Sequence, residues 1–91
     1  MVKVNESGKY IEMLEAIALD NEDLEVLIEE KVKRFKKNPH DTRLGNHALT
    51  RRMEGKWAFS VTDDIRIVYE WIGKDTARFH AIGPHIEVYK K

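Results

Sequence analysis

The stretch Asp64–Trp71 constrains the fold more than any other part of this chain. Large apolar side chains occupy every second position of it: Ile65, Ile67, Tyr69 and Trp71. A period of two is typical of a β-strand that buries one face, and β-branched and aromatic residues suit a pleated surface. We therefore expect a strand whose apolar face lies in the core and whose other face presents Arg66.

Two segments before this strand have the periodicity of helices. Apolar residues recur at three- and four-residue spacing from Tyr10 to Ala18 and again from Leu24 to Phe35. Ser7 can cap the first helix and Asn21 the second, and Asn38-Pro39 is a stop signal for the second. Because the connection between them is only a few residues long, we expect an antiparallel helix hairpin.

The character of the chain becomes β after Gly55. Short alternating runs separated by turn residues predict four strands: Trp57–Val61, Asp64–Trp71, Ala77–Ile82 and His85–Tyr89. Val2–Val4 can add a short first strand. Helices followed by strands indicate an α+β fold, in which the N-terminal hairpin packs on a twisted antiparallel sheet of about four strands. We expect one domain over residues 1–91, with the second face of the sheet open.

Charge is distributed unevenly, although the formal net charge is zero. Residues 1–30 hold two lysines against nine acids, and residues 31–91 hold fourteen Lys and Arg against seven acids. The helix dipole explains acids in a first helical turn but not the excess of cations later, which indicates a polyanionic partner. We expect six cations to face RNA: Lys33, Lys36, Arg43, Arg51, Arg52 and Lys56.

The sequence also suggests where the protein acts. It has no cysteine, which suits a reducing compartment. The first residues have no apolar core of the kind that a signal peptide requires, and no apolar run is long enough to cross a membrane. We expect a cytoplasmic protein that needs no membrane and no cofactor.

Five residues form the candidate site. Strand parity permits Arg66, His85 and Tyr89 on the open face, His47 lies in the loop that enters the sheet, and Asp64 flanks the central strand. Histidine is an acid or base near neutral pH, and arginine supplies fixed positive charge that can grip a phosphate. This set suits a metal-independent ribonuclease, in which the RNA 2′-hydroxyl attacks the adjacent phosphate. His80 has no assigned face, because a shift of one residue reverses it.

Each of these residues also has a structural explanation. Arg66 can be an ordinary solvated side chain on a half-exposed sheet. His47 can bond loop carbonyls, Asp64 can shape its turn, and Tyr89 can pack. A zinc site built on His80 and His85 lacks the close ligand spacing that such sites show.

Several motifs occur in the order and at the spacing of a known family. They are Asn38-Pro39, His47-Ala48-Leu49, Gly55-Lys56-Trp57, Asp64–Tyr69 and Gly83–Tyr89. With these motifs the chain resembles the RelE/ParE superfamily of toxins from bacterial type II toxin–antitoxin systems, nearest the RelE, YoeB and YafQ mRNA interferases. The resemblance extends from about Val32 to Tyr89. It implies metal-free, ribosome-dependent cleavage of mRNA, and it implies a cognate antitoxin, the ribosome and mRNA as partners.

The resemblance also implies roles for single residues. His47 resembles the histidine before the Leu and Gly of the YafQ pattern, and Asp64 resembles the acidic residue of that branch. Arg66 resembles the arginine of the RelE Tyr-Arg-Leu-Val-Tyr strand. His85 resembles the histidine near the C-terminus, and Tyr89 resembles the terminal aromatic residue.

Two alternatives remain open at this point. One is a ParE-like toxin that binds DNA gyrase and cleaves nothing, although such a protein has no need of the His47, Asp64 and His85 set. The other is a non-catalytic relative that only binds antitoxin. Ser60, Trp57 and Phe59 favour this second alternative, because family members carry polar groups at those positions.

Overall fold

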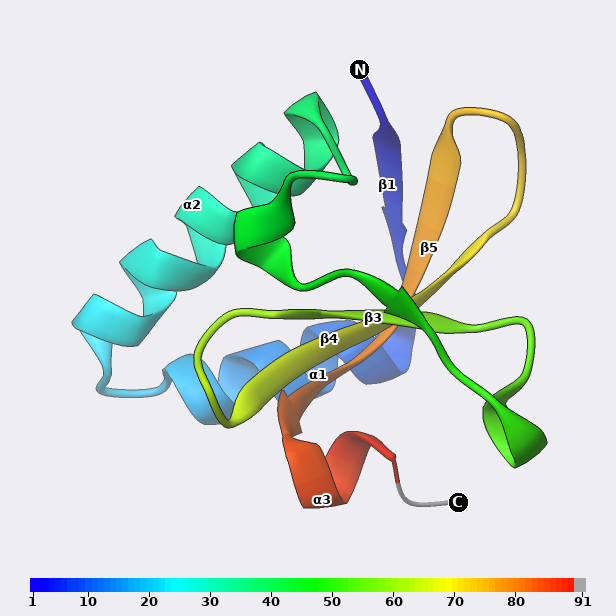
Figure 1. Ribbon diagram of the computed structural model, residues 1–91. Helices are drawn as coiled ribbons and strands as arrows, with labels where there is room; N and C mark the ends of the chain where they lie inside the picture. The colour runs from blue at the N-terminus through cyan, green and yellow to red at the C-terminus, as the bar shows by residue number, and fades with distance from the viewer. Residues whose placement is uncertain (90–91) are drawn as a thin grey trace.

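Two N-terminal helices pack on a five-stranded sheet in the computed structural model, which describes residues 1–89 (Figure 1). The strands are β1 (Lys3–Glu6), β2 (His47–Ala48), β3 (Trp57–Ser60), β4 (Ile65–Trp71) and β5 (Thr76–Pro84). The helices are α1 (Gly8–Ala18), α2 (Glu22–Lys37) and α3 (His85–Val88), with two 3₁₀ turns, η1 (Thr42–Leu44) and η2 (Arg51–Met53). The predicted α+β fold is confirmed. No helix in the described part of the chain is long and apolar enough to cross a membrane.

The two long helices begin and end where the sequence predicts. The Ser7 hydroxyl accepts a hydrogen bond from the Tyr10 amide at 3.0 Å, and the Asn21 side chain accepts one from the Leu24 amide at 3.1 Å. Both bonds satisfy donors that a helix start leaves free. At the other end of α2, the Asn38 amide donates to the Arg34 carbonyl at 2.9 Å.

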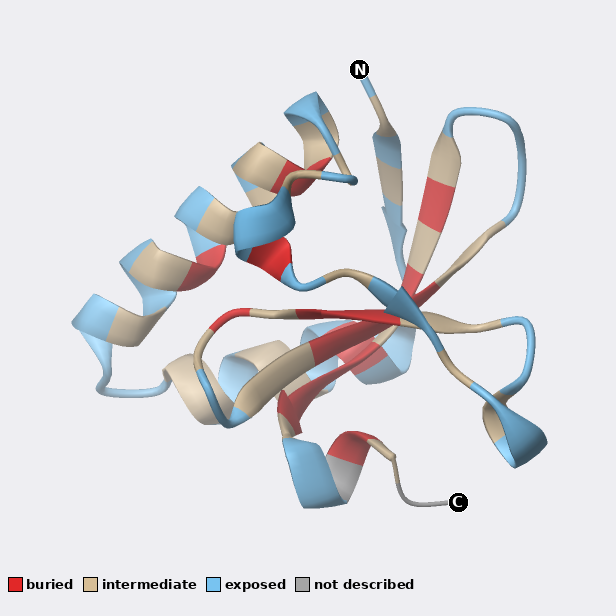
Figure 2. Ribbon diagram, viewed as in Figure 1, coloured by how far each residue is buried: buried red, intermediate tan, exposed pale blue. Residues whose placement is uncertain are grey.

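The core between the helices and the sheet is aromatic. Phe35 of α2 stacks on Phe59 of β3 with ring centroids 4.7 Å apart, and it meets Tyr69 and Phe79 edge-on at 4.8 and 5.6 Å. These edge and stacked geometries are the ones that ring quadrupoles favour. Figure 2 shows the buried residues concentrated on β3, β4, β5 and the facing side of α2. The alternation along β4 therefore defines the core face, as predicted.

The sheet has five strands in the order β1-β5-β4-β3-β2, one more than expected. It is also mixed, because β1 pairs in parallel with β5 and all other pairs are antiparallel. A parallel pair needs a long crossover connection, and here the connection includes both helices and three strands. Pairing between the first and last strands of the chain leaves no local signal in the sequence.

The prediction of a strand over His85–Tyr89 is wrong, since α3 occupies His85–Val88. A strand would have buried Ile86, but Ile86 is 79% exposed and Val88 is 4% exposed. Val88 packs on Ala58, Val68 and Ala81, which form the outer face of the sheet. The face that we expected to be open is therefore partly covered, and α2 and α3 lie on opposite sides of β3 and β4 (Figure 1).

A bulge in β5 also changes the predicted alternation. The pairing of β4 with β5 shifts between Val68 and Tyr69, so that Val68 faces Ala81 and Tyr69 faces Phe79. His80 is the extra residue. Beyond it Ala81 belongs to the outer face and Ile82 to the core, the reverse of what unbroken alternation from Ala77 and Phe79 would give.

Candidate functional site

Arg66 lies on the outer face of β4, opposite the aromatic core. Its cross-strand neighbours are Ser60 on β3 and Gly83 on β5, so neither neighbouring strand places a bulky side chain opposite it. Its Nη1 donates to the Thr62 carbonyl at 2.6 Å, which fixes the guanidinium against the β3–β4 turn. A guanidinium has five N–H donors, and this bond uses only one end of the fork. The other end can bind an anion.

Asp64 and His85 meet where β4 begins and β5 ends. The His85 amide donates to the Asp64 carbonyl at 2.9 Å and lies 3.4 Å from Asp64 Oδ1. This contact extends the β4–β5 ladder by one pair, which is where the chain turns into α3. Both side chains are exposed. The backbone thus holds a histidine and a carboxylate together where β4 begins and β5 ends.

Tyr89 follows α3 and lies against His85. Their rings are 4.5 Å apart and perpendicular, and the Tyr89 amide donates to the His85 carbonyl at 3.3 Å. Burial raises the pKa of Tyr89, and the nearby Arg66 guanidinium opposes part of that rise. The Tyr89 hydroxyl is buried and has no hydrogen-bond partner among the described residues. The structure therefore places a neutral hydroxyl beside the Arg66 guanidinium.

His47 lies farther from this group. It pairs with Ala58 on β3 and therefore shares the outer face, but β3 separates it from Arg66 on β4. His47 is exposed, and its Nδ1 lies 3.0 Å from the Gly45 carbonyl. The structure thus brings Asp64, Arg66, His85 and Tyr89 together and places His47 at the margin.

The six cations that we expected to face RNA divide into two groups. Arg51 and Arg52 line a cavity of about 530 Å³ together with Tyr89, next to the candidate site. Arg51 has a left-handed backbone (φ 57°), a strained conformation for a residue other than glycine. Lys56 lines a neighbouring cavity on the same sheet face.

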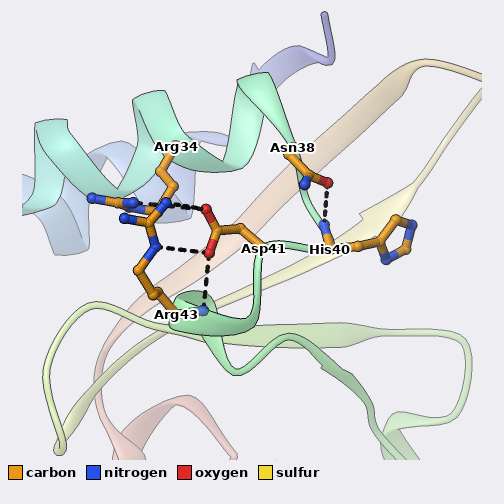
Figure 3. A network of polar contacts seen from close by, with 5 residues as sticks. All are labelled: Arg34, Asn38, His40, Asp41 and Arg43. Carbon is orange, nitrogen blue, oxygen red and sulfur yellow. Dashed lines mark hydrogen bonds and ion pairs between the residues drawn. The ribbon is translucent and has the colours of Figure 1, made fainter.

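Lys33, Lys36 and Arg43 belong to the other side of the molecule, on α2 and on the loop after it. Arg43 is paired with Asp41 through Nε at 3.0 Å and Nη2 at 2.7 Å (Figure 3). Arg34 lies 3.6 Å from the same carboxylate. The hydrogen bonds from Arg43 hold the pKa of Asp41 well below its usual range. Arg43 is therefore engaged within the fold.

Sequence reasoning missed one polar pair on the outer face. His80 Nε2 lies 2.8 Å from Glu70 Oε1, across β4 and β5. His80 lies on this face because it follows Phe79, which is in the core. Among the side chains that the structure describes, no three from His, Asp and Glu are grouped so that they could hold a metal ion.

Comparison with known proteins identifies the fold. A copper-bound mutant toxin from Helicobacter pylori is 25% identical over 98% of this chain and 100% of its own, with a TM-score of 0.76. YafQ from Escherichia coli is 15% identical over 99% and 100%, with a TM-score of 0.80. YoeB in a YoeB–YefM complex from Staphylococcus aureus is 15% identical over 93% and 98%, with a TM-score of 0.75.

These structural neighbours confirm, at the level of the fold, the resemblance to the RelE/YoeB/YafQ toxin superfamily. The likeness to YafQ and YoeB, at 15% identity, is one of fold. Neither the models of protein families nor the curated protein sequences give a match to this chain.

Proposed function

We propose that this protein is the toxin of a type II toxin–antitoxin system and cleaves mRNA on the ribosome in the cytoplasm, without a metal ion. The observation that carries the proposal is the group formed by Asp64, Arg66, His85 and Tyr89. It combines an acid–base group, a fixed cation and a buried hydroxyl where β4 begins and β5 ends. The shared fold with YafQ and YoeB supports the toxin role.

The chemistry needs three actions. The 2′-oxygen attacks the neighbouring phosphorus while a general base takes its proton, the developing charge on the phosphate is stabilised, and the bond from phosphorus to the 5′-oxygen breaks as a general acid protonates that oxygen. The products are a 2′,3′-cyclic phosphate and a 5′-hydroxyl. His85 acts as general acid or base in these proton transfers. Arg66 binds the scissile phosphate and stabilises the charge that develops on it. Tyr89 donates its hydroxyl to a phosphate oxygen or orients a base.

Asp64 and His47 assist in this proposal. Asp64 lies close enough to the start of α3 to position His85, because it bonds the His85 amide. His47 shares the outer face, but β3 separates it from Arg66. It therefore contacts a neighbouring part of the RNA, or it carries out the proton transfer that His85 does not.

Mapping of mRNA 5′ ends after induction without antitoxin tests the proposal. The parent should produce cuts in phase with codons and arrest growth. Arg66→Ala and His85→Ala should abolish both, whereas Lys74→Ala, an exposed cation in the β4–β5 turn, should behave like the parent. If the Arg66 and His85 variants are as toxic as the parent, the residue assignment is wrong. DNA damage without cuts would indicate a gyrase-binding toxin instead.

The partner is the second half of the proposal. YoeB from S. aureus is found in complex with YefM, and this chain offers comparable opportunities for a wrapping segment. Ile11, Leu19 and Val26 are exposed apolar side chains on the helix hairpin, and β1 forms one edge of the sheet. We infer that a largely disordered antitoxin orders on binding, as a helix on the hairpin or as a strand added to an edge.

A further inference from the structure

A second polar site lies on the outer face of the sheet, separate from the group around Arg66. Along β4 the outward residues are Arg66, Val68 and Glu70, and Val68 is 1% exposed. Val88 of α3 packs on Val68. This apolar contact divides the face into two areas, one around Arg66 and the other around Glu70 and His80.

The second area contains a cavity of about 340 Å³ with cationic walls. Lys9, Lys56 and Arg78 line it together with His80, and no acidic residue in the described part of the chain lines it. Val68 and Val88 form part of an apolar floor. Cations above an apolar floor suit a ligand that has both a phosphate and a less polar body.

The start of α1 adds to the positive potential of this cavity. Ser7 lines it and is fixed there, because its hydroxyl lies 3.3 Å from the His80 carbonyl. Within the described residues, the Gly8 and Lys9 amides have no backbone acceptor. Free amides at the N-terminus of an eleven-residue helix favour an anion.

His80 is held in position at the wall of this cavity. The Glu70 carboxylate bonds Nε2 at 2.8 Å, which fixes the ring and leaves Nδ1 as its remaining polar atom. Arg78 is held in a similar way, since its Nη1 donates to Asn5 Oδ1 at 2.9 Å. The cavity wall is therefore organised before any ligand arrives.

We propose that this cavity binds a phosphate group of the RNA strand, a few nucleotides from the phosphate bound by Arg66. The proposal rests on the proposed ribonuclease function. Arg78, which lines the cavity, pairs with Glu70, and Glu70 lies four residues along β4 from Arg66, or about 13 Å at 3.3 Å per residue. A stacked strand advances about 3.4 Å per nucleotide, so the two sites are at most about four nucleotides apart. Simultaneous binding at both would fix the strand for cleavage.

Binding of uncleavable 2′-O-methyl RNA of three and of eight nucleotides tests this inference. The parent should bind the octamer at least tenfold more tightly than the trimer. Substitution of Lys9→Gln and Arg78→Gln together should remove most of that advantage and leave trimer binding unchanged. The salt slope for the octamer should fall by about 1.4, because each lost contact to a single strand contributes about 0.7. Lys74→Gln is the matched control and should change neither.

A measurement on the parent protein keeps the test independent of folding in the double variant. The octamer should shift the amide resonances of Gly8 and Lys9, and the trimer should not. Equal binding of both oligonucleotides by the parent would overturn the inference. So would saturation of these amides by inorganic phosphate while the octamer leaves them unmoved, because the cavity would then be a site for a free anion.

The two proposals fail in different ways. If the parent makes no cuts in mRNA but binds the octamer through Lys9 and Arg78, the ribonuclease function is wrong and the phosphate site stands. If the parent cuts mRNA and the double variant binds the octamer like the parent, only the phosphate site is wrong.

Discussion

The Tyr89 hydroxyl is the group whose role is easiest to separate from folding. It is buried without a partner among the described residues, and leaving a polar group in that state costs about 1–3 kcal/mol. A buried polar group without a partner calls for an explanation, and a role in the candidate site supplies one. Its neighbours are His85, whose ring is 4.5 Å away, and Arg66.

Tyr89→Phe should therefore have opposite effects on stability and activity. Loss of the unpaired hydroxyl should raise the free energy of unfolding by about 1 kcal/mol, or leave it unchanged. Loss of a hydrogen bond to the reacting phosphate should lower the cleavage rate about tenfold, since 1.4 kcal/mol is a factor of ten. Denaturant unfolding and single-turnover cleavage measure the two effects. A variant that is less stable and equally active would show that the hydroxyl is only structural.

His85 and Tyr89 lie together as predicted, although the predicted strand over these residues is a helix followed by a turn. The sequence predicts them on one face because residues four apart point the same way in a strand. Residues four apart also share a face of a helical turn, so His85, at the start of α3, and Tyr89, just after its end, stay together. Arg66, which depends only on the strong alternation of β4, is placed correctly.

Among the elements, those with local signals follow the sequence and those that depend on distant pairing do not. Ser7, Asn21 and Asn38 mark the ends of α1 and α2 through their own hydrogen bonds. The β5 bulge and α3 depend on what lies across the sheet. Val88 is drawn to the outer face by Val68 and Ala81, a contact that cannot be read from residues 85–89 alone.

The loop after α2 is held by Asp41, and its stability should depend on pH. Asp41 accepts hydrogen bonds from Arg43 and lies beside Arg34 (Figure 3), so its pKa in the folded protein is far below the unfolded value of about 3.9. The contribution to stability is therefore complete well above pH 3.9 and is lost as the pH falls through and below that value.

Asp41→Asn should destabilise the protein slightly at pH 7, because exposed ion pairs contribute little. The difference in unfolding free energy between parent and variant should stay constant from about pH 7 to 5 and shrink below about pH 4. Asp63→Asn, at an exposed turn position, is the control and should show no such trend. A difference that grows towards low pH would contradict the assignment.

On the scale of the whole molecule, charge is arranged by side. All nine acidic residues of positions 1–30 are exposed on the N-terminal part of the fold, whereas Arg51, Arg52 and Lys56 lie near the candidate site. Phosphates would be repelled by the first surface and attracted by the second. We therefore expect the acidic outer face of the hairpin to point away from RNA.

Neutralising Arg51 and Arg52 together should weaken RNA binding and make it less sensitive to salt. Each lost phosphate contact should reduce the slope of log affinity against log salt by about 0.7, the value for a single strand. Arg43→Gln is the comparison variant. Because Arg43 is already bonded to Asp41, this substitution should change the salt slope less. An unchanged slope in the Arg51 and Arg52 variant would place the RNA elsewhere.

Antitoxin binding should stabilise the whole domain. A ligand that binds only the native state at a thousandfold excess over its Kd adds about 4 kcal/mol. For a domain of this size, 1 kcal/mol shifts Tm by about 4–8 °C, so the complex should melt more than 15 °C above the isolated chain. Calorimetry of the protein with and without the product of its neighbouring gene measures this. Equal melting temperatures, with nothing co-purifying, would refute the toxin–antitoxin assignment.

The parallel pairing of β1 with β5 also has a consequence in time. Ser7, at the end of β1, bonds His80 in β5, 73 positions later in the chain. Synthesis proceeds at about 5–20 residues per second, so β1 waits for several seconds before its partner strand exists. The sheet cannot close, and the cationic cavity beside α1 cannot form, until most of the chain has left the ribosome. The proposed substrate is mRNA on the ribosome, and a ribosome also synthesises this chain. Because the fold forms late, the protein cannot act on that ribosome until synthesis of the chain is nearly complete.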